Sequence, residues 1–322
     1  MDNLTHTLVG LALADAGPKR TSRLGTAVVV VGANLPDLDA LIYLAGSSSD
    51  ALAFRRGWTH GVLAMVALPL LLTAAALGWS RLTARRRGRA PAVPVSAGWL
   101  LALATIGVCS HPLLDLLNTY GVRLLMPFSS RWFYGDALFI VDPWVWVALS
   151  IGILLTRLRV RRAASPAEAQ RAARPARMAL GMVVMYALAM AISSGAGRAY
   201  VDRQSQTAAL RTMVAPVPGT PFRREVIRDM GGKYEFGELV LPRAAYTWIT
   251  VEPTGSDAPG VRAASATQAG SRFLRWSRFP QFVTQHRGDS IRVLMSDARY
   301  AHPGGRSWAS VAVTVPLSAS VP

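Results

Sequence analysis

Three of the five histidines lie in the first 111 residues, each inside or next to an apolar segment: His6, His60 and His111. His6 and His111 also have aspartate and asparagine within a few residues. Asp37 and Asp39 lie in a further apolar region. An ionisable side chain at the bilayer midplane costs roughly 2.5–3.5 kcal/mol on insertion scales, so several together indicate function. Histidine and aspartate are also ligands of zinc and related hydrolytic metals. The pattern predicts a metal site embedded in a membrane.

The densest group of these residues follows one helical stripe. His111, Asp115 and Asn118 are spaced i, i+4 and i+7, which puts them on one face of a helix. A histidine and a carboxylate one turn apart can bind one metal ion, or the carboxylate can orient the imidazole ring. The alternative is a buried His–Asp pair that holds two helices together. Pro112 favours a site, because broken membrane helices tend to line sites rather than lipid.

Asp37 and Asp39 are two residues apart and cannot share a face in the middle of a helix. With Asn34 as a cap and Pro36 in the first turn, both fall at a predicted helix N-terminus. Complementation of the helix dipole is a sufficient explanation for Asp39 alone. Two carboxylates in an apolar stretch nevertheless favour a bound cation, so we predict that both are ligands.

The remaining polar residues are weaker candidates. His6 and His60 each follow a threonine at the start of an apolar run. A lone histidine there is usually an interfacial residue, and the carboxylates elsewhere strengthen its interpretation as a ligand. Two aspartates before a later apolar run are expected to be solvated, the second as a helix cap, and the last two histidines are expected to be structural or at the surface: Asp136, Asp142, His286 and His302.

The apolar segments that must position these residues suggest a multi-pass helical membrane bundle. The chain has 322 residues, of which 51% are hydrophobic, and its mean hydropathy is +0.28. A span needs about 20 apolar residues, and four segments qualify: 58–79, 97–117, 143–158 and 178–199. Segments 4–14 and 24–35 are shorter and are predicted to form a re-entrant or half-spanning pair joined by the turn at 17–20, and a third short run covers 38–45.

From about residue 200 the apolar runs shorten and glycine and proline become frequent. Segments 246–252, 290–295 and 307–315 alternate or are rich in β-branched residues, as strands are. We therefore predict two domains, a membrane-embedded domain over 1–199 and a soluble, mainly β (α+β) domain over 200–322. Segment 163–175 is expected to be a linker or a helix.

The net charge is +17, and almost all of the basic excess is arginine. The arginines gather in loops beside apolar runs, with five in 81–90, seven in 157–177 and further basic residues in 18–23. This distribution fits the positive-inside rule better than nucleic-acid binding. It predicts that the polar stretches and the tail lie outside the cytoplasm. The single cysteine, Cys109, excludes an intrachain disulfide and any CxxC motif.

Five segments of the membrane half resemble, in order, the YdjM family of bacterial inner-membrane proteins: LTHTLVG (4–10), NLPDLD (34–39), RGWTH (56–60), HPLLDLLNTYG (111–121) and DALFIVDP (136–143). The tail is similar at FLRWSRFP (273–280) and DARY (297–300). That family is described as membrane-bound metal-dependent hydrolases. The resemblance implies a hydrolase whose metal ligands are the His and Asp residues of these motifs.

The sequence thus predicts a hydrolase that acts on a phosphoester or acyl bond of a lipid or lipid-linked substrate at the outer face of the inner membrane. One or two divalent ions are expected, with zinc preferred and manganese or magnesium as alternatives. The predicted ligands are His6, Asp37, Asp39, His60, His111 and Asp115.

Three further residues have expected roles, with Asp39 as a bridging ligand or general base, Asn118 as a contact to a ligand or substrate, and Arg56 as a partner of phosphate. No nucleic-acid partner is expected, and the sequence identifies no protein partner. Two rival interpretations stay open: a transporter with an intramembrane proton relay, and a scaffold whose metal staples short helices while the tail binds a partner.

Overall fold

The computed structural model describes residues 1–17, 24–44, 48–87, 95–300 and 308–317. Its contacts divide the chain into two units. The first contains residues 1–39, 56–193 and 216–221, and the second contains residues 40–55, 194–215 and 222–322. The predicted basic turn at 18–23 and His302 lie outside the described residues.

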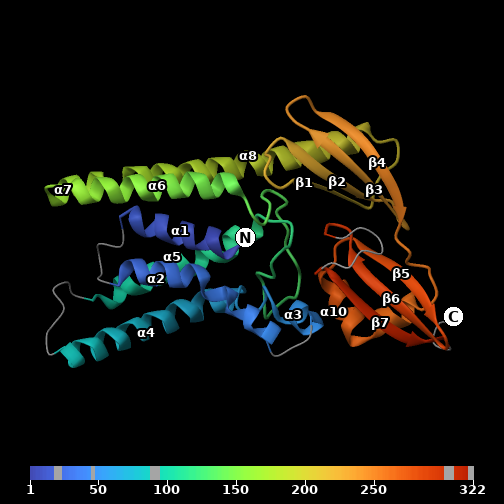
Figure 1. Ribbon diagram of the computed structural model, residues 1–322, viewed down its shortest axis with the longest axis horizontal. Coiled ribbons are helices and arrows are strands. Elements are labelled where there is room, and N and C mark those ends of the chain that lie inside the picture. Colours follow the sequence, from blue (N-terminus) through green and yellow to red (C-terminus); the bar gives the residue numbers. More distant parts are fainter. Residues whose placement is uncertain (18–23, 45–47, 88–94, 301–307, 318–322) are drawn as a thin grey trace. The chain divides into compact units, whose positions relative to one another are not determined.

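Helices account for the first two thirds of the chain (Figure 1). They are α1 (Asn3–Asp15), α2 (Gly25–Asn34), the 3-10 helix η2 (Leu35–Leu44), α3 (Ser48–Phe54), α4 (Val62–Arg87), α5 (Ala97–Leu116), α6 (Pro143–Arg162), α7 (Pro166–Arg171) and α8 (Arg174–Gln204).

Five helical segments are long and apolar enough to cross a membrane: Gly25–Leu44, Val62–Arg86, Ala97–Leu116, Pro143–Arg162 and Ala167–Gln204. The sequence predicted four of these segments, and Gly25–Leu44 is the additional one. The two short runs on either side of Pro36 form one continuous helical segment, because α2 leads directly into η2. A proline in the first turn of a helix lacks only an amide hydrogen that has no helical partner there. The chain is a multi-pass membrane protein.

The helices of the first unit pack around two apolar clusters. One joins α1, α6 and α8 through residues that include Val9, Leu149 and Val183. The other joins α1, α2, α4 and α5, with Val29 and Leu103 at its centre. Helices α2 and α5 approach closely because glycines face each other, and a β-carbon added at Gly107 would lie 2.5 Å from the Val29 carbonyl oxygen. This close approach brings the ends of α2 and α5 together, where His111 and the Asp37 segment lie.

The second unit contains two antiparallel sheets. The first has the order β1 (Arg211–Pro216), β2 (Arg223–Asp229), β3 (Lys233–Val240) and β4 (Ala245–Pro253). The second has the order β5 (Pro280–Arg287), β6 (Ser290–Asp297) and β7 (Ser310–Pro316). Two helices, α9 (Val261–Ala266) and α10 (Gln268–Trp276), precede β5. The predicted combination of a helical membrane part and a mainly β region is confirmed. Strands β4 and β6 cover two of the predicted strands, and β7 covers the third only from Ser310 onward.

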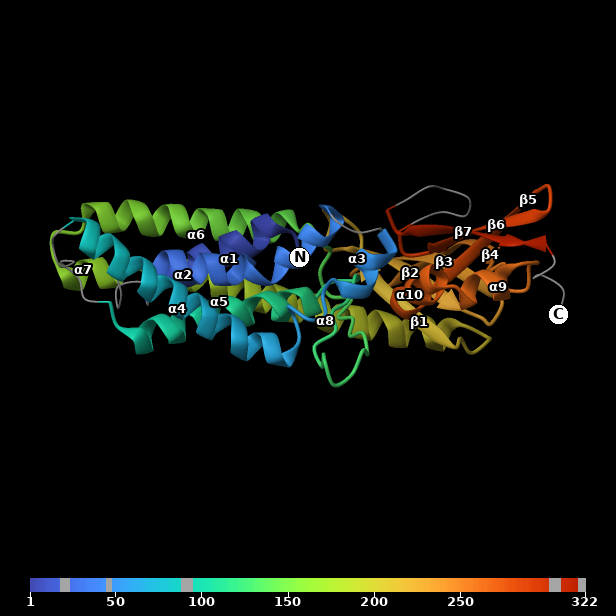
Figure 2. The ribbon, with the colours of Figure 1, turned by 90° about the horizontal axis from the view of Figure 1, so that it is seen from below.

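Several segments tie the second unit together. One face of the first sheet packs Val214, Val226 and Leu239 against Val201 at the end of α8. The carboxylate of Asp297 accepts hydrogen bonds from the Ser277 hydroxyl at 2.7 Å and from the Arg299 guanidinium at 2.8 Å, so it joins the two tail motifs. Viewed from below, α9 and α10 lie beside the strands (Figure 2).

Candidate metal centre

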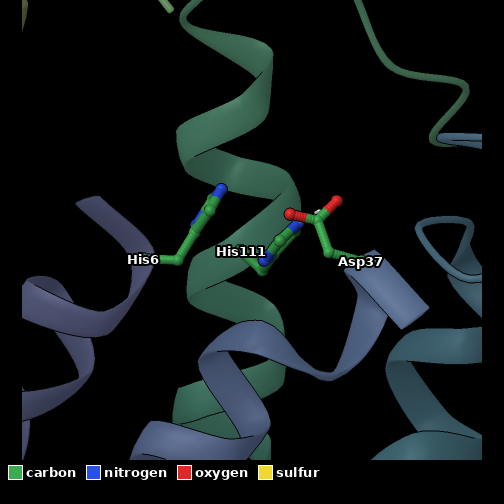
Figure 3. Close-up of side chains that lie close together, drawn as sticks. All are labelled: His6, Asp37 and His111. Carbon is green, nitrogen blue, oxygen red and sulfur yellow. Dashed lines mark ion pairs between the residues drawn. The ribbon is translucent and has the colours of Figure 1, made fainter. Parts of the chain in front are cut away.

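Five ionisable side chains from four segments of the first unit meet at one place. They are His6 on α1, Asp37 on η2, His60 in the turn before α4, and His111 and Asp115 on α5. Figure 3 shows three of them, with His6 and Asp37 reaching His111 from different helices. The three histidines and Asp115 are fully buried, whereas Asp37 is 8% exposed. Burial of this many ionisable groups is costly unless they share a cation or pair with one another.

Local interactions place each side chain. The Asp2 side chain caps α1 by accepting the Thr5 amide hydrogen at 3.0 Å, which fixes the first turn and therefore His6. Helix α5 carries His111 and Asp115 one turn apart, on the same face, as the spacing predicted. Pro112 lies within α5 beside His111.

The group formed by His60, His111 and Asp115 has nearly equal spacings between its ligand atoms. The Nε2 atoms of His60 and His111 lie 3.1 Å apart. Oδ2 of Asp115 lies 3.3 Å from the first of these nitrogens and 3.4 Å from the second. Ligands that bind zinc tetrahedrally at about 2.0–2.1 Å are separated by about 3.3 Å, so this triangle has the size that such an ion requires. Oδ2 of Asp115 has no hydrogen-bond partner among the described residues.

The hydrogen bonds on the far side of both rings determine where their protons lie. Nδ1 of His111 is 2.7 Å from the carbonyl oxygen of Ala33, which can only accept, so this nitrogen carries the hydrogen. Nδ1 of His60 is 2.9 Å from the hydroxyl of Thr59, whose own hydrogen is donated to Asp39. That nitrogen therefore also donates. In the neutral rings, the two facing Nε2 atoms both carry lone pairs, and a metal ion or a shared proton could lie between them.

A second group shares His111 and contains His6 and Asp37. Oδ1 of Asp37 lies 3.7 Å from Nε2 of His111 and 3.9 Å from Nε2 of His60, so this carboxylate faces the same point as the triangle. The ring of His6 stacks on that of His111 with centroids 3.7 Å apart, and neither of its nitrogens has a hydrogen-bond partner among the described residues. Its Nε2 lies 3.5 Å from the other oxygen of Asp115.

Burial lowers the pKa of His6 to about 4 and also lowers the pKa of His60. Neutral imidazole is the form that binds metal. These side chains fit a metal ion by chemistry, by spacing and by their unfilled bonding capacity. The two groups of buried His and Asp side chains could therefore hold a divalent cation.

Asp39 lies beside this cluster and contacts His60 from behind. Its Oδ2 is 3.4 Å from Nδ1 of His60, and it accepts the Thr59 hydroxyl at 2.9 Å and the backbone amide hydrogen of Arg56 at 2.7 Å. Asp39 is buried, with 3% of its surface exposed. This arrangement differs from that of Asp37, whose oxygen faces the Nε2 atoms.

Arg56 and Asn118 contact the opposite side of Asp115. The Arg56 guanidinium is 5% exposed, lies 3.3 Å from Oδ1 of Asp115 and stacks over the Tyr120 ring at 4.6 Å. Its backbone has a φ of 51°, a conformation that non-glycine residues rarely adopt. Nδ2 of Asn118 donates to Oδ1 of Asp115 at 3.4 Å, and its own oxygen accepts the Tyr120 amide hydrogen at 2.8 Å. The α-amino group of Met1 also contacts Oδ1 of Asp115.

The two aspartates before α6 are buried, at 1% and 5% exposure, so the expectation that Asp136 and Asp142 are solvated was wrong. Asp142 caps α6 as predicted, accepting the Trp144 amide hydrogen at 3.0 Å, and it also accepts the Tyr186 hydroxyl at 3.1 Å. Asp142 is buried because this second hydrogen bond holds its side chain against Tyr186 of α8. In the second unit, His286 is exposed on β5.

Sequence reasoning missed the partners of the histidine rings. The Ala33 carbonyl has no signature in the sequence, because any residue supplies one. Thr59 did carry a signal, since the same Thr-His pair occurs at Thr5 and His6.

A family model of the YdjM inner membrane protein matches residues 1–197, which include every residue of the cluster. The chain is also 25% identical over 158 residues to the uncharacterized protein YfhP of Bacillus subtilis (strain 168). That match covers 46% of this chain and 44% of the relative, so less than half of the relative's length is matched. No solved structure matches the chain. Because the family model covers more than half of the sequence, the chain belongs to the YdjM inner membrane protein family.

Proposed function

We propose that this protein is a membrane-bound metal-dependent hydrolase whose metal site is formed by His60, His111, Asp115 and Asp37. The observation that carries the proposal is the 3.1 Å separation of the two Nε2 atoms while both Nδ1 atoms donate to other groups. Structural metal sites are usually closed by protein ligands, and catalytic sites keep one position open. Asp37 is 8% exposed, whereas the other three proposed ligands are fully buried. We therefore propose that the open coordination position, which water or substrate would reach, lies on the side of Asp37.

The charges favour a single ion. Oδ1 of Asp115 is already contacted by the Arg56 guanidinium. A second divalent ion beside that oxygen would be repelled by this positive charge. His111 has only one free ring nitrogen, since Nδ1 is bonded to Ala33, so it cannot bind two ions. We therefore place His6 next to the ion, stacked on His111, and expect one ion per chain.

A bound divalent ion would lower the pKa of a coordinated water toward about 7 and polarise a phosphoryl or acyl oxygen. The residues of the chain supply the rest. We assign Asp39 and Thr59 a positioning role, because they hold the His60 ring with Nε2 directed at the site. Asn118 holds Asp115 in the same way.

Arg56 is the candidate for substrate binding. Its Nε has no hydrogen-bond partner among the described residues, and the hydrogen bonds from its guanidinium to Asn118, Gly121 and Met1 are long, at 3.4–3.5 Å. A guanidinium with spare donors recognises phosphate in a bidentate manner. Together with the surrounding membrane helices, this favours a phosphoester of a lipid or lipid-linked compound over an acyl ester. The arginine-rich ends of α4 and α6 support an orientation with the site toward the outer face of the inner membrane.

The proposal is tested with two chromogenic substrates on the full chain in detergent, a 4-nitrophenyl phosphodiester with a long alkyl chain and the matched 4-nitrophenyl acyl ester. We expect metal-dependent release of nitrophenol from the phosphodiester, abolished by a chelator and restored by zinc or manganese. Zinc-loaded protein that hydrolyses neither substrate, nor any phospholipid, would contradict the assignment as a hydrolase.

A metal-stapled scaffold is the second candidate, and one observation favours it. Four of the five clustered side chains are completely buried, and they come from α1, α5 and the turn before α4. An ion there would join segments far apart in the sequence. This alternative predicts tightly bound metal, no turnover, and unfolding of the bundle when the metal is removed.

A further inference from the structure

An apolar groove lies between α6 and α8, far along the chain from the metal cluster. It has a volume of about 260 Å³, and its lining includes Ile151, Leu155, Met178 and Met182. Each of these side chains is at least 42% exposed in the protein alone. Ala148, Gly152 and Arg159 also line the groove.

The groove exists because the two helices are joined tightly at one level. Gly152 permits the contact, since a β-carbon added there would lie 2.4 Å from Cβ of Ala179. Close beside it, the Thr156 hydroxyl accepts the backbone amide hydrogen of Ala176 at 2.9 Å. Small residues at such contacts let helix backbones approach in membranes. The larger side chains on either side of this contact form the walls of the groove.

A basic pocket adjoins the groove, and its lining residues belong to the end of α6 and to α7 and the residues beside it. Helix α7 connects α6 to α8 (Figure 1). It has a volume of about 300 Å³ and is lined by Arg159, Arg162, Arg171 and Glu168, together with two alanines. Arg159 lines both cavities. Glu168 accepts the backbone amide hydrogen of Ala164 at 2.8 Å, and none of the three arginines has an ion-pair partner in the part of the chain that the structure describes.

We propose that the groove and the basic pocket together bind one anionic phospholipid. The acyl chains would lie along the groove and the phosphate would contact the three guanidinium groups, with Arg159 at the junction. A net excess of positive charge faces the pocket, because three arginines oppose a single glutamate. Basic pockets between transmembrane helices recognise anionic headgroups in this way. The proposal does not depend on the metal site.

The test is a competition read by native mass spectrometry. The full chain in detergent is mixed with equal amounts of phosphatidylglycerol and phosphatidylcholine, and the bound lipids are counted. We expect preferential retention of phosphatidylglycerol. The variant with Arg159→Gln, Arg162→Gln and Arg171→Gln should lose this preference by about tenfold or more, in line with the contribution of basic residues near anionic headgroups.

The matched control removes three arginines from the end of α4, as Arg81→Gln, Arg85→Gln and Arg86→Gln. These side chains are also basic and next to an apolar helix, but they line neither cavity. The control should retain phosphatidylglycerol as the wild type does. An equal loss in both variants would show a diffuse effect of charge and would overturn the proposal.

A groove-filling variant separates a lipid from a free phosphate. Met182→Trp places a larger ring in the groove and leaves the arginines unchanged, and Met178→Trp is the second choice if the first does not fold. Either should weaken retention of phosphatidylglycerol, while inorganic phosphate should not displace the lipid from the wild type. Unchanged retention in a folded tryptophan variant, or displacement by phosphate, would contradict binding of the acyl chains.

Discussion

Nε2 of His60 and Nε2 of His111 lie 3.1 Å apart, although Nδ1 of each ring donates its hydrogen to another group. Two neutral imidazoles cannot satisfy each other in this arrangement, because neither facing nitrogen has a hydrogen to donate. Either a metal ion or an additional proton must lie between them. The carboxylate oxygen of Asp115 lies 3.3 Å and 3.4 Å from the same nitrogens, so the three atoms form a group that could hold a metal ion.

Asp39 should affect metal affinity without being a ligand. Asp39→Asn removes the charge that holds the Thr59 hydroxyl and the His60 ring in place. Loss of such a partner typically costs about 10–100-fold in metal affinity. Zinc titration against a competing chelator measures the change. Asp15→Asn is the matched control. Asp15 is another buried carboxylate of the same unit, but it lies at the opposite end of α1 from His6 and pairs with Arg157 of α6. An affinity unchanged by Asp39→Asn would refute the positioning role.

The close approach of α2 and α5 should be required for the site. In Gly107→Ala the new β-carbon would lie 2.5 Å from the Val29 carbonyl oxygen, so the two helices must move apart. We expect a lower melting temperature and weaker zinc binding. Gly98→Ala, on the same helix, has no neighbour within 4 Å and should be neutral or stabilising by about 0.5–1 kcal/mol. Equal melting temperatures for the two variants would show that the contact is unimportant.

Arg56→Lys should separate phosphate recognition from metal binding. Lysine keeps the positive charge near Asp115 but loses the planar fork that binds two oxygens of a phosphate. We expect unchanged zinc content and at least about a tenfold loss in kcat/KM for the phosphodiester, since tenfold corresponds to 1.4 kcal/mol of transition-state stabilisation. If kcat/KM for the acyl ester falls by the same factor, Arg56 acts on the metal site as a whole, and the preference for phosphoesters is refuted.

Glu225 should make the second unit less stable as the pH rises. Burial raises the pKa of this carboxyl group from 4.5 to about 7, so the folded protein keeps the proton while the unfolded chain loses it. Between these two values, stability falls as the pH increases, and above about pH 7 the loss is complete. Glu225→Gln should therefore stabilise the second unit at pH 8 and have little effect at pH 4.5.

Hydrogen-exchange protection of β2 and β3 in the full chain measures this effect. Glu238→Gln is the contrasting variant, because Glu238 is the antiparallel partner of Glu225 and its pKa is lowered by Arg223. That variant should gain no protection at pH 8. Equal protection of the wild type and Glu225→Gln at both pH values would show that the carboxyl group titrates normally.

The sequence predicted the helical membrane part, the mainly β tail and the pair of His111 and Asp115 on α5, because each depends on a local period or spacing. Asn118, which was predicted on the same helical stripe, lies beyond α5, which ends at Leu116. His111 and Asp115 share one face through their i, i+4 spacing, which needs no knowledge of the rest of the fold. Residues 24–35 and 38–45 were treated as separate pieces because each apolar run is too short to span a membrane alone. Pro36 does lie in the first turn of a helix as predicted, but that helix, η2, continues directly from α2.

Other features depend on contacts between distant segments and could not be predicted. The burial of Asp142 requires Tyr186 of α8, and the proton on His111 is fixed by a carbonyl group of α2. The different positions of Asp37, which faces the site, and Asp39, which contacts His60 from behind, likewise depend on where His60 lies in a distant segment.

The most direct test of the account is the metal content of the full chain, purified in detergent and measured by mass spectrometry. The wild type is compared with His60→Ala, His111→Ala and Asp115→Ala, and with Asp15→Asn as the folded control. The account predicts about one zinc or manganese ion per chain in the wild type and the control, and loss of the ion in the three variants. A wild type that binds no divalent metal after reconstitution would show that a shared proton joins His60 and His111, and the metal centre would be refuted.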